Sequence, residues 1–190
     1  MMKTLNSVSR PENKTRLLIA GVLIIAACAG YYASYAFAAT INCSSDPCYG
    51  TSSGDTINGT NSAEKIEAGD GRDTVNSGGG DDFSYGQVDA DLVYGGNGDD
   101  DVSGGLGNDR ATLDGGVYGN DGRDFVFGND GIDTLYGNGS SDYLYGNDHN
   151  DALHAKDNFP DNAVGGGGGF NNCYVDVGLD PFTNCDAVNP

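Results

Sequence analysis

Acidic residues recur every nine positions through most of this chain of 190 residues. Counted on the residue that ends each glycine-rich stretch, they form two series with a step of nine, separated by one step of fifteen. The first series is Asp55, Glu64, Asp73, Asp82, Asp91, Asp100 and Asp109, the second is Asp124, Asp133, Asp142 and Asp151, and Asn162 and Asn171 follow as two neutral copies. A fixed short period predicts a repeat architecture, in which each unit packs only on its neighbours.

An apolar residue lies two positions after most of these acidic residues. The set is Ile57, Ile66, Val75, Val93, Val102, Ala111, Val126, Leu135, Leu144, Leu153 and Val164, with Cys173 in the last copy and Ser84 as the exception. Side chains alternate between the faces of a strand, so a three-residue strand centred on this residue points it inward and its neighbours outward. Six-residue turns join such strands, because glycine adopts left-handed backbone angles at little cost. The sequence therefore predicts an all-β solenoid with two repeats per coil.

Two copies, GGNGDDDVS (Gly95–Ser103) and GGLGNDRAT (Gly104–Thr112), resemble the nonapeptide G-G-x-G-x-D-x-U-x of the RTX (hemolysin-type) calcium-binding family. The resemblance covers about residues 50–175 and implies a right-handed parallel β-roll. It also implies that several Ca²⁺ ions bind through aspartate side chains and loop carbonyls of two turns on one edge. The candidate calcium ligands are Asp55, Asp73, Asp82, Asp91, Asp100, Asp109, Asp124, Asp133, Asp142 and Asp151.

Charge repulsion gives an independent reason to expect a cation. Same-edge aspartates, eighteen residues apart, stack at about 4.8 Å, and two carboxylates at about 5 Å repel by roughly 3 kcal/mol at an effective dielectric constant of 20. A cation between adjacent turns reverses this sign, and an irregular cage of oxygen ligands suits Ca²⁺ better than Mg²⁺. Three departures weaken the expectation locally: the longer side chain of Glu64, Val88-Asp89 in place of the glycine-bearing part of its turn, and the neutral Asn162 and Asn171.

The step of fifteen leaves two registers open. Six extra residues, Leu113–Tyr118, form an inserted loop that keeps the two edges alternating, which is favoured because Gly115-Gly116 is typical of a turn. The alternative is one shortened coil, which places Asp109 and Asp124 on the same edge.

Residues 1–38 have the composition of an export signal. Four basic residues precede the apolar run Leu17–Gly30, and Ala36-Phe37-Ala38 supplies a small-x-small cleavage site. Cleavage after Ala38 is favoured, with lipidation of Cys28 or an uncut membrane anchor over residues 17–39 as alternatives. Each of the three makes the rest of the chain secreted or attached at the cell surface, with membrane contact only through the N-terminus.

Four cysteines remain after residue 38, an even number that indicates disulfides in an exported chain. Cys43–Cys48 and Cys173–Cys185 each close a short loop and are the predicted pairs, while a cross-end pairing stays open. The resulting organisation is a signal peptide or anchor (1–38), an N-terminal cap (39–49), the calcium-binding β-roll (50–164), and a last turn with a C-terminal disulfide cap (165–190).

The predicted function is an extracellular calcium-binding structural or binding module without enzymatic activity. Acidic residues outnumber basic ones 28 to 9, which excludes nucleic acid as a partner. His149 and His154 belong to no catalytic arrangement, and a polysaccharide-acting enzyme is disfavoured because the carboxylates lie in turns. The alternative is an adhesin or self-assembling protein, with a cell-surface or polysaccharide partner or a second copy. It would use the outward aromatic residues Phe83, Tyr85, Tyr94, Phe125, Phe127, Tyr136, Tyr143 and Tyr145, although strand propensity also explains them.

Overall fold

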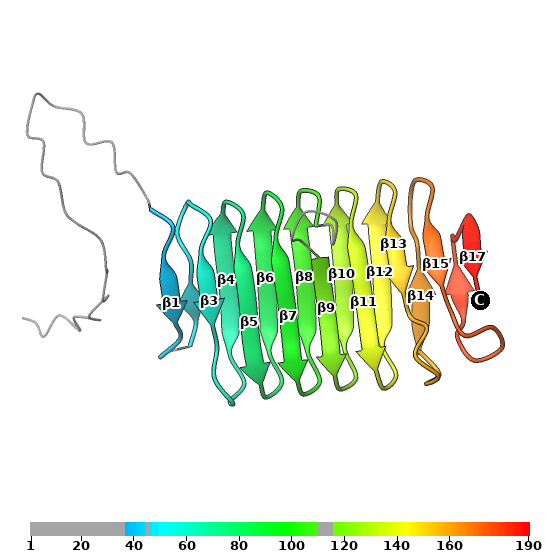
Figure 1. Ribbon diagram of the computed structural model, residues 1–190, viewed down its shortest axis with the longest axis horizontal. Helices are drawn as coiled ribbons and strands as arrows, with labels where there is room; N and C mark the ends of the chain where they lie inside the picture. Colours follow the sequence, from blue (N-terminus) through cyan, green and yellow to red (C-terminus); the bar gives the residue numbers. More distant parts are fainter. Residues whose placement is uncertain (1–36, 45, 110–115) are drawn as a thin grey trace, which may run out of the picture. The chain divides into compact units, whose positions relative to one another are not determined.

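The computed structural model describes residues 37–44, 46–109 and 116–190, and every regular element in these ranges is a β-strand (Figure 1). The export signal, anchor and lipidation site expected before residue 39 lie almost wholly outside the described residues. Within the described ranges, no helix is long and apolar enough to cross a membrane.

The strands are short, between two and six residues each. They are β1 (Thr40–Asn42), β2 (Cys48–Tyr49), β3 (Thr56–Asn58), β4 (Lys65–Asp70), β5 (Thr74–Gly79), β6 (Phe83–Val88), β7 (Leu92–Asn97), β8 (Asp101–Leu106), β9 (Gly116–Asp121), β10 (Phe125–Asp130), β11 (Thr134–Gly139), β12 (Tyr143–Asp148), β13 (Ala152–His154), β14 (Ala163–Gly165), β15 (Asn172–Tyr174), β16 (Phe182–Thr183) and β17 (Ala187–Asn189).

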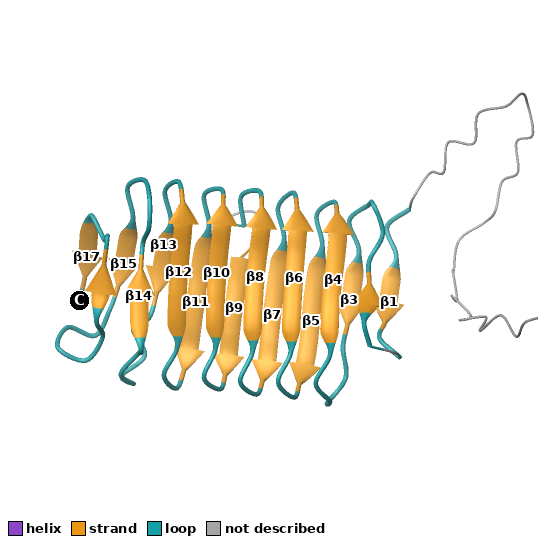
Figure 2. Ribbon diagram, turned by 180° about the vertical axis from the view of Figure 1, so that it is seen from behind, coloured by secondary structure: helices purple, strands orange, loops and turns teal. Residues whose placement is uncertain are grey.

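Successive strands alternate between two sheets, and every strand pair is parallel. Odd-numbered strands form a nine-stranded sheet in the order β1 to β17, and even-numbered strands form an eight-stranded sheet in the order β16 to β2. The coils stack along one axis, with turns along the two long edges (Figures 1 and 2). The predicted parallel β-solenoid is confirmed.

The core consists of two columns of aliphatic side chains, one from each sheet, packed between the sheets. In the nine-stranded sheet, Ile57 pairs in register with Val75, and Val75 with Val93. In the eight-stranded sheet, Val102 pairs with Val126, and Val126 with Leu144. All of these side chains are fully buried, so the predicted inward positions are confirmed wherever the structure describes them.

The insertion leaves the edges alternating, and the shortened-coil alternative is wrong. Strand β8 pairs with β10, and β7 with β9, so the coils on either side of the insertion stack directly. The predicted loop boundaries are too late, because Gly116, Val117 and Tyr118 belong to β9. Val117 fills the core between Val93 and Leu135, the place expected for Ala111, which lies outside the described residues. Strand β9 therefore begins where an aliphatic side chain, Val117, can fill the core.

Ser84 breaks the aliphatic column for a local reason. Its hydroxyl hydrogen-bonds that of Ser77 across the core, and both side chains are fully buried. Ser77 begins its turn at the place where later turns have glycine, for example Gly86 and Gly95. The two serines therefore compensate for each other.

Disulfides join Cys43 to Cys48 and Cys173 to Cys185, with Cα–Cα distances of 5.6 and 5.7 Å. The predicted connectivity is confirmed, and the cross-end pairing is wrong. One bridge closes the loop between β1 and β2, and the other ties β15 to the segment between β16 and β17.

Replacing either serine alone should destabilise the folded chain by about 1–3 kcal/mol, because a buried hydroxyl is left without its partner. The double variant Ser77→Ala/Ser84→Val removes both hydroxyls and should recover most of that loss. Urea unfolding of the two single variants and the double variant in saturating calcium measures the coupling. Additive losses in the double variant would contradict the pairing.

Candidate metal centres

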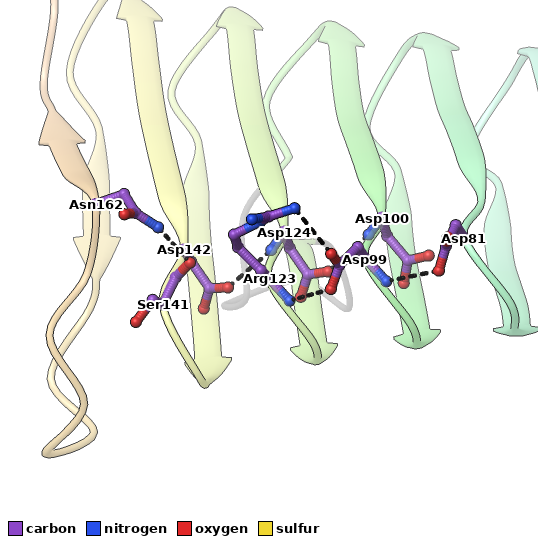
Figure 3. A network of polar contacts seen from close by, with 8 residues as sticks. All are labelled: Asp81, Asp99, Asp100, Arg123, Asp124, Ser141, Asp142 and Asn162. Atoms are coloured by element: carbon purple, nitrogen blue, oxygen red, sulfur yellow. Dashed lines mark hydrogen bonds and ion pairs between the residues drawn. The ribbon is translucent and has the colours of Figure 1, made fainter.

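Two ladders of carboxylates run along the solenoid, one on each edge. In each ladder, the backbone N–H of one acidic residue donates to Oδ1 of its counterpart in the next coil. The N–O distances are 2.8 Å for Asp73 to Asp91, 2.8 Å for Asp82 to Asp100 and 2.9 Å for Asp133 to Asp151. Figure 3 shows Asp100, Asp124 and Asp142 in one ladder. The side chains predicted as ligands are thus brought together as two rows rather than as one cluster.

The ladders cross the insertion without a break. Asp100 donates to Asp124 and Asp109 to Asp133, at 2.8 and 2.9 Å, although 24 residues separate each pair. Near the C-terminus the predicted alignment is wrong by one residue, because Asp161 and not Asn162 accepts from Asp142. Asn162 instead donates its side-chain amide to the Ser141 carbonyl. Asp161, Asp180 and Asp186 were not predicted, because their turns differ in length from the repeat. Each of the three accepts a backbone N–H in the ladders.

The second carboxylate oxygen of most ladder residues is buried without a partner. Among the described residues, Oδ2 has no hydrogen bond in Asp73, Asp82, Asp91, Asp100, Asp109, Asp124, Asp133, Asp142, Asp151 and Asp161. Each of these residues is at most 5% exposed. A buried carboxylate oxygen without a partner is unfavourable in a folded protein, so the repetition calls for a missing ligand.

Several of the free oxygens face a glycine and a carbonyl. A Cβ built on Gly95 would lie 2.6 Å from Asp100 Oδ2 and 2.8 Å from the Gly119 carbonyl oxygen of the next coil. For Gly128 the distances are 2.5 Å to Asp133 Oδ2 and 2.8 Å to the Gly146 carbonyl. Glycine therefore keeps a small space open between a carboxylate oxygen and a carbonyl oxygen.

This space is not the same in every turn. Both oxygens lie close to the added Cβ in the turns that begin with Gly86, Gly95, Gly104, Gly128 and Gly146. At Gly119 and Gly137 the carboxylate oxygen is close, at 2.4 and 2.5 Å, and no carbonyl is among the nearest atoms. The turns of Asp73, Asp82 and Asp161 have the buried Ala68, Ser77 and Ala155 at that place, so a Cβ already occupies it. The ladders from Asp91 to Asp151 therefore fit a cation best.

The first member of each ladder is already satisfied by its own turn. Asp55 Oδ2 accepts from the Thr51 N–H at 2.7 Å. Glu64 accepts from the Thr60 N–H at 3.0 Å and from the Thr60 hydroxyl. Glu64 fits its expected departure from the pattern, and Asp55 has less to offer an ion than the other predicted ligands.

The turn at Val88-Asp89 keeps the ladder geometry with Gln87 and Asp89 where other turns have glycine. Gln87 and Asp89 take positive φ angles of 83° and 79°, a region that non-glycine residues enter rarely. Asp91 still accepts from Asp73 and donates to Asp109. The backbone of this turn therefore adopts the repeat conformation against the preference of its residues.

Burial raises the pKa of the ladder aspartates from 3.8. Desolvation is the main cause, and the bond from the backbone N–H opposes it. The pKa values are about 8 for Asp91, Asp133 and Asp161, about 7 for Asp82, Asp124 and Asp142, and about 6 for Asp73, Asp100, Asp109 and Asp151. These carboxylates therefore ionise less readily than an exposed aspartate, and a cation beside them would favour the ionised form.

The donor set is suited to a hard cation. No three His, Cys, Asp or Glu side chains converge on one point in the described part of the chain. An ion at these turns would therefore combine ladder carboxylates with backbone carbonyls, all of them oxygen ligands. Ca²⁺ accepts irregular oxygen ligands of this kind, whereas Mg²⁺ demands near-octahedral geometry and keeps its waters. The free Oδ2 atoms and the glycine spaces both fit Ca²⁺.

An outer row of polar turn residues runs beside one ladder (Figure 3). The Asp99 N–H donates to Asp81 at 3.1 Å, and Arg123 donates its backbone N–H and its guanidinium to Asp99, both at 3.0 Å. These groups are exposed, so the ion pair contributes little to stability.

The fold and the ladders define the class of protein: a parallel β-solenoid whose turns set buried carboxylates beside backbone carbonyls. A family model of the RTX calcium-binding nonapeptide repeat, four copies long, matches residues 49–84, 78–111 and 117–155, more than half of the chain. The chain belongs to this family of calcium-binding repeat proteins. Comparisons with curated proteins and with solved structures give no match.

Without calcium, the free energy of unfolding should fall as pH rises from about 4 to about 8. The ladder aspartates hold protons more tightly when folded, so their contribution is complete below about pH 4 and is lost through their raised pKa values of about 6 to 8. In saturating calcium the free energy should instead rise over this interval, because the ion needs deprotonated carboxylates. Circular dichroism in EDTA, which reports the folded fraction at each pH, and urea unfolding in calcium test both signs. The same pH trend in both would contradict the site.

Asp133→Asn should distinguish the roles of the two oxygens of a ladder carboxylate, because it keeps an acceptor for the ladder bond and removes the charge. Asn171 shows that an amide oxygen can accept the ladder bond, from Asp151 at 2.8 Å. The variant should therefore stabilise the calcium-free fold at pH 8 by about 1–3 kcal/mol and raise the calcium midpoint about tenfold, which is about 1.4 kcal/mol. Exposed Asp121→Asn is the control, and an equal shift in its calcium midpoint would contradict a specific role for Asp133.

Proposed function

We propose that this chain is an exported calcium-binding β-roll that folds when it binds Ca²⁺ and acts as a structural or binding module outside the cell. The observation that carries the proposal is the repeated buried carboxylate with one oxygen free. Family membership supports calcium as the ion. The buried aspartates are engaged in the ladders, and we assign the chain no catalytic role.

Coupling between folding and calcium follows from the charges. Ladder carboxylates are ionised in the unfolded chain at neutral pH, and folding without an ion must bury them. Calcium binds the folded turns and not the unfolded chain, so its binding free energy becomes folding free energy. We expect dissociation constants of about 10⁻⁴–10⁻³ M, the range usual for extracellular modules.

An extracellular location is supported by the disulfides and by the composition of residues 1–38. Disulfides persist in oxidising compartments and are rare in the cytosol, and this chain has one near each end of the described solenoid. Calcium is scarce in the cytosol and abundant outside. We propose that the chain stays unfolded during export and folds on arrival, at the cell surface or in the extracellular matrix.

Far-UV circular dichroism during a calcium titration tests the proposal. The chain from residue 39 onward, treated with EDTA, should show a disordered spectrum that changes to a β spectrum with CaCl₂ and not with MgCl₂. A β-rich spectrum in EDTA at neutral pH that calcium leaves unchanged would overturn calcium-dependent folding. An equal response to magnesium would overturn the choice of ion.

A second candidate function is adhesion or self-assembly through the outward aromatic residues. The structure divides them between the sheets. On the eight-stranded sheet, Phe125 stacks on Tyr143 at 4.4 Å and Phe127 on Tyr145 at 5.4 Å. On the nine-stranded sheet, Tyr94, Tyr118 and Tyr136 continue into His154 and Tyr174. These columns stabilise the stack of coils and also present flat aromatic strips to a partner.

A further inference from the structure

The outward face of the nine-stranded sheet has no charged side chain in its two continuous columns. One column has Thr40, Thr56, Thr74, Leu92, Gly116, Thr134, Ala152, Asn172 and Ala187, and the other has Asn42, Asn58, Asn76, Tyr94, Tyr118, Tyr136, His154, Tyr174 and Asn189. Burial lowers the pKa of His154, which keeps it neutral. In a chain of formal net charge −19, two uncharged columns along all nine described strands are unusual. The one acidic residue within these strands, Asp121, lies at the turn-side end of β9.

The eight-stranded sheet differs in this respect. Its outward columns include Lys65, Glu67 and Asp101, and Lys65 pairs with Glu67 at 2.6 Å. Outward positions of this solenoid therefore accept charged residues without loss of the strand. The absence of charge from the nine-stranded face is a property of that face and not a requirement of the fold.

The uncharged face is also flat. Its five aromatic rings stack with centroids 4.4 to 4.8 Å apart, so each ring face is covered by the next ring. The Tyr118 ring lies over Gly116, where an added Cβ would be 2.9 Å from it. In the N-terminal coils, Asn76 donates to Asn58 and Asn58 to Asn42. The surface therefore presents ring edges, hydroxyls and amides at the spacing of the strands.

These features narrow the class of partner. An uncharged face gives no attraction to nucleic acid or to a charged membrane. Sugars stack on the faces of aromatic rings, and here the neighbouring rings cover those faces. A flat partner with the same repeat spacing remains, and a second copy of this chain supplies it. Identical faces meet in a two-fold interface, which is self-complementary by symmetry.

The available area is sufficient for such a pair. With strands about 4.8 Å apart and about 3.3 Å per residue, the two columns alone cover about 430 Å² per copy. The full length of all nine strands covers about 600 Å² per copy, or about 1,200 Å² for two. Specific interfaces of standard size begin near this area. The acidic turns lie at the edges of the face, so the two copies bring like charges near each other only at the rim.

We propose that two copies of this chain pair through the outward face of the nine-stranded sheet. The inference rests on the proposed calcium-binding β-roll only in that calcium provides the folded state. Salt should strengthen the pairing, because it screens repulsion between the acidic edges. An interface held by ion pairs would weaken in salt.

Sedimentation velocity of the full chain in calcium, over a wide range of concentration, tests the proposal. Wild type should be dimeric at high concentration, and Tyr118→Glu should raise the dissociation constant at least tenfold. The matched control is Tyr145→Glu on the other sheet, which should leave it unchanged. All three proteins share the same N-terminal segment, so any association through that segment cancels in the comparison.

Each outcome is decisive. A wild-type monomer at all concentrations, including one that binds a neutral polysaccharide such as dextran, would overturn the pairing. So would a dimer broken by Tyr145→Glu and not by Tyr118→Glu. Circular dichroism checks that each variant folds, and if Tyr118→Glu does not, Thr74→Glu places the same charge on the same face. A chain that folds and dimerises in EDTA would contradict calcium-dependent folding and still support the pairing.

Discussion

In the described coils from Asp73 to Asp161, each ladder carboxylate is hydrogen-bonded at one oxygen and has no partner at the other. Oδ1 of each ladder aspartate closes the backbone of the preceding coil, at N–O distances such as 2.8 Å from Asp73 to Asp91. Making that bond buries the side chain and leaves Oδ2 without a partner among the described residues. The hydrogen bond that joins two coils therefore also leaves a buried carboxylate oxygen that a cation would satisfy. The nine-residue period repeats this bond and this unpaired oxygen along each edge.

Glycine in the turn leaves room beside the unpaired carboxylate oxygen. At Gly95 and Gly128 an added Cβ would meet both the free carboxylate oxygen and a carbonyl of the next coil. The space exists because a hydrogen atom stands where another residue has a methyl group or more. In the turns with Ala68 and Ser77 a Cβ occupies this space. Ser77 also hydrogen-bonds Ser84, a polar pair across the described core. The first residue of each of these turns therefore affects both the space beside the carboxylate and the packing of the core.

The period made most of the fold predictable. Aspartate and aliphatic residues in phase predicted the strands, the inward columns, the two edges and the continuous stack, and short cysteine spacings predicted both disulfides. The misses occur where the period changes. Val117 replaces Ala111 in the column because the strand resumes where an aliphatic side chain fits between Val93 and Leu135. Asp161 was missed because sequence spacing cannot tell which residue of a lengthened turn reaches the ladder.

The composition of the ladders differs between the ends and the middle. At the N-terminal end, Asp55 and Glu64 have their carboxylates satisfied by Thr51 and Thr60. Near the C-terminal end, the amide of Asn171 makes the ladder bond without charge and donates to two carbonyls. Each of these regions also has a disulfide. The free carboxylate oxygens lie between them, so the proposed dependence on an ion concerns the coils from Asp73 to Asp161, whereas the described ends have these groups satisfied without one. A repeat protein folds by propagation from its neighbours, and under this proposal the terminal coils would supply the edges on which the calcium-binding coils stack.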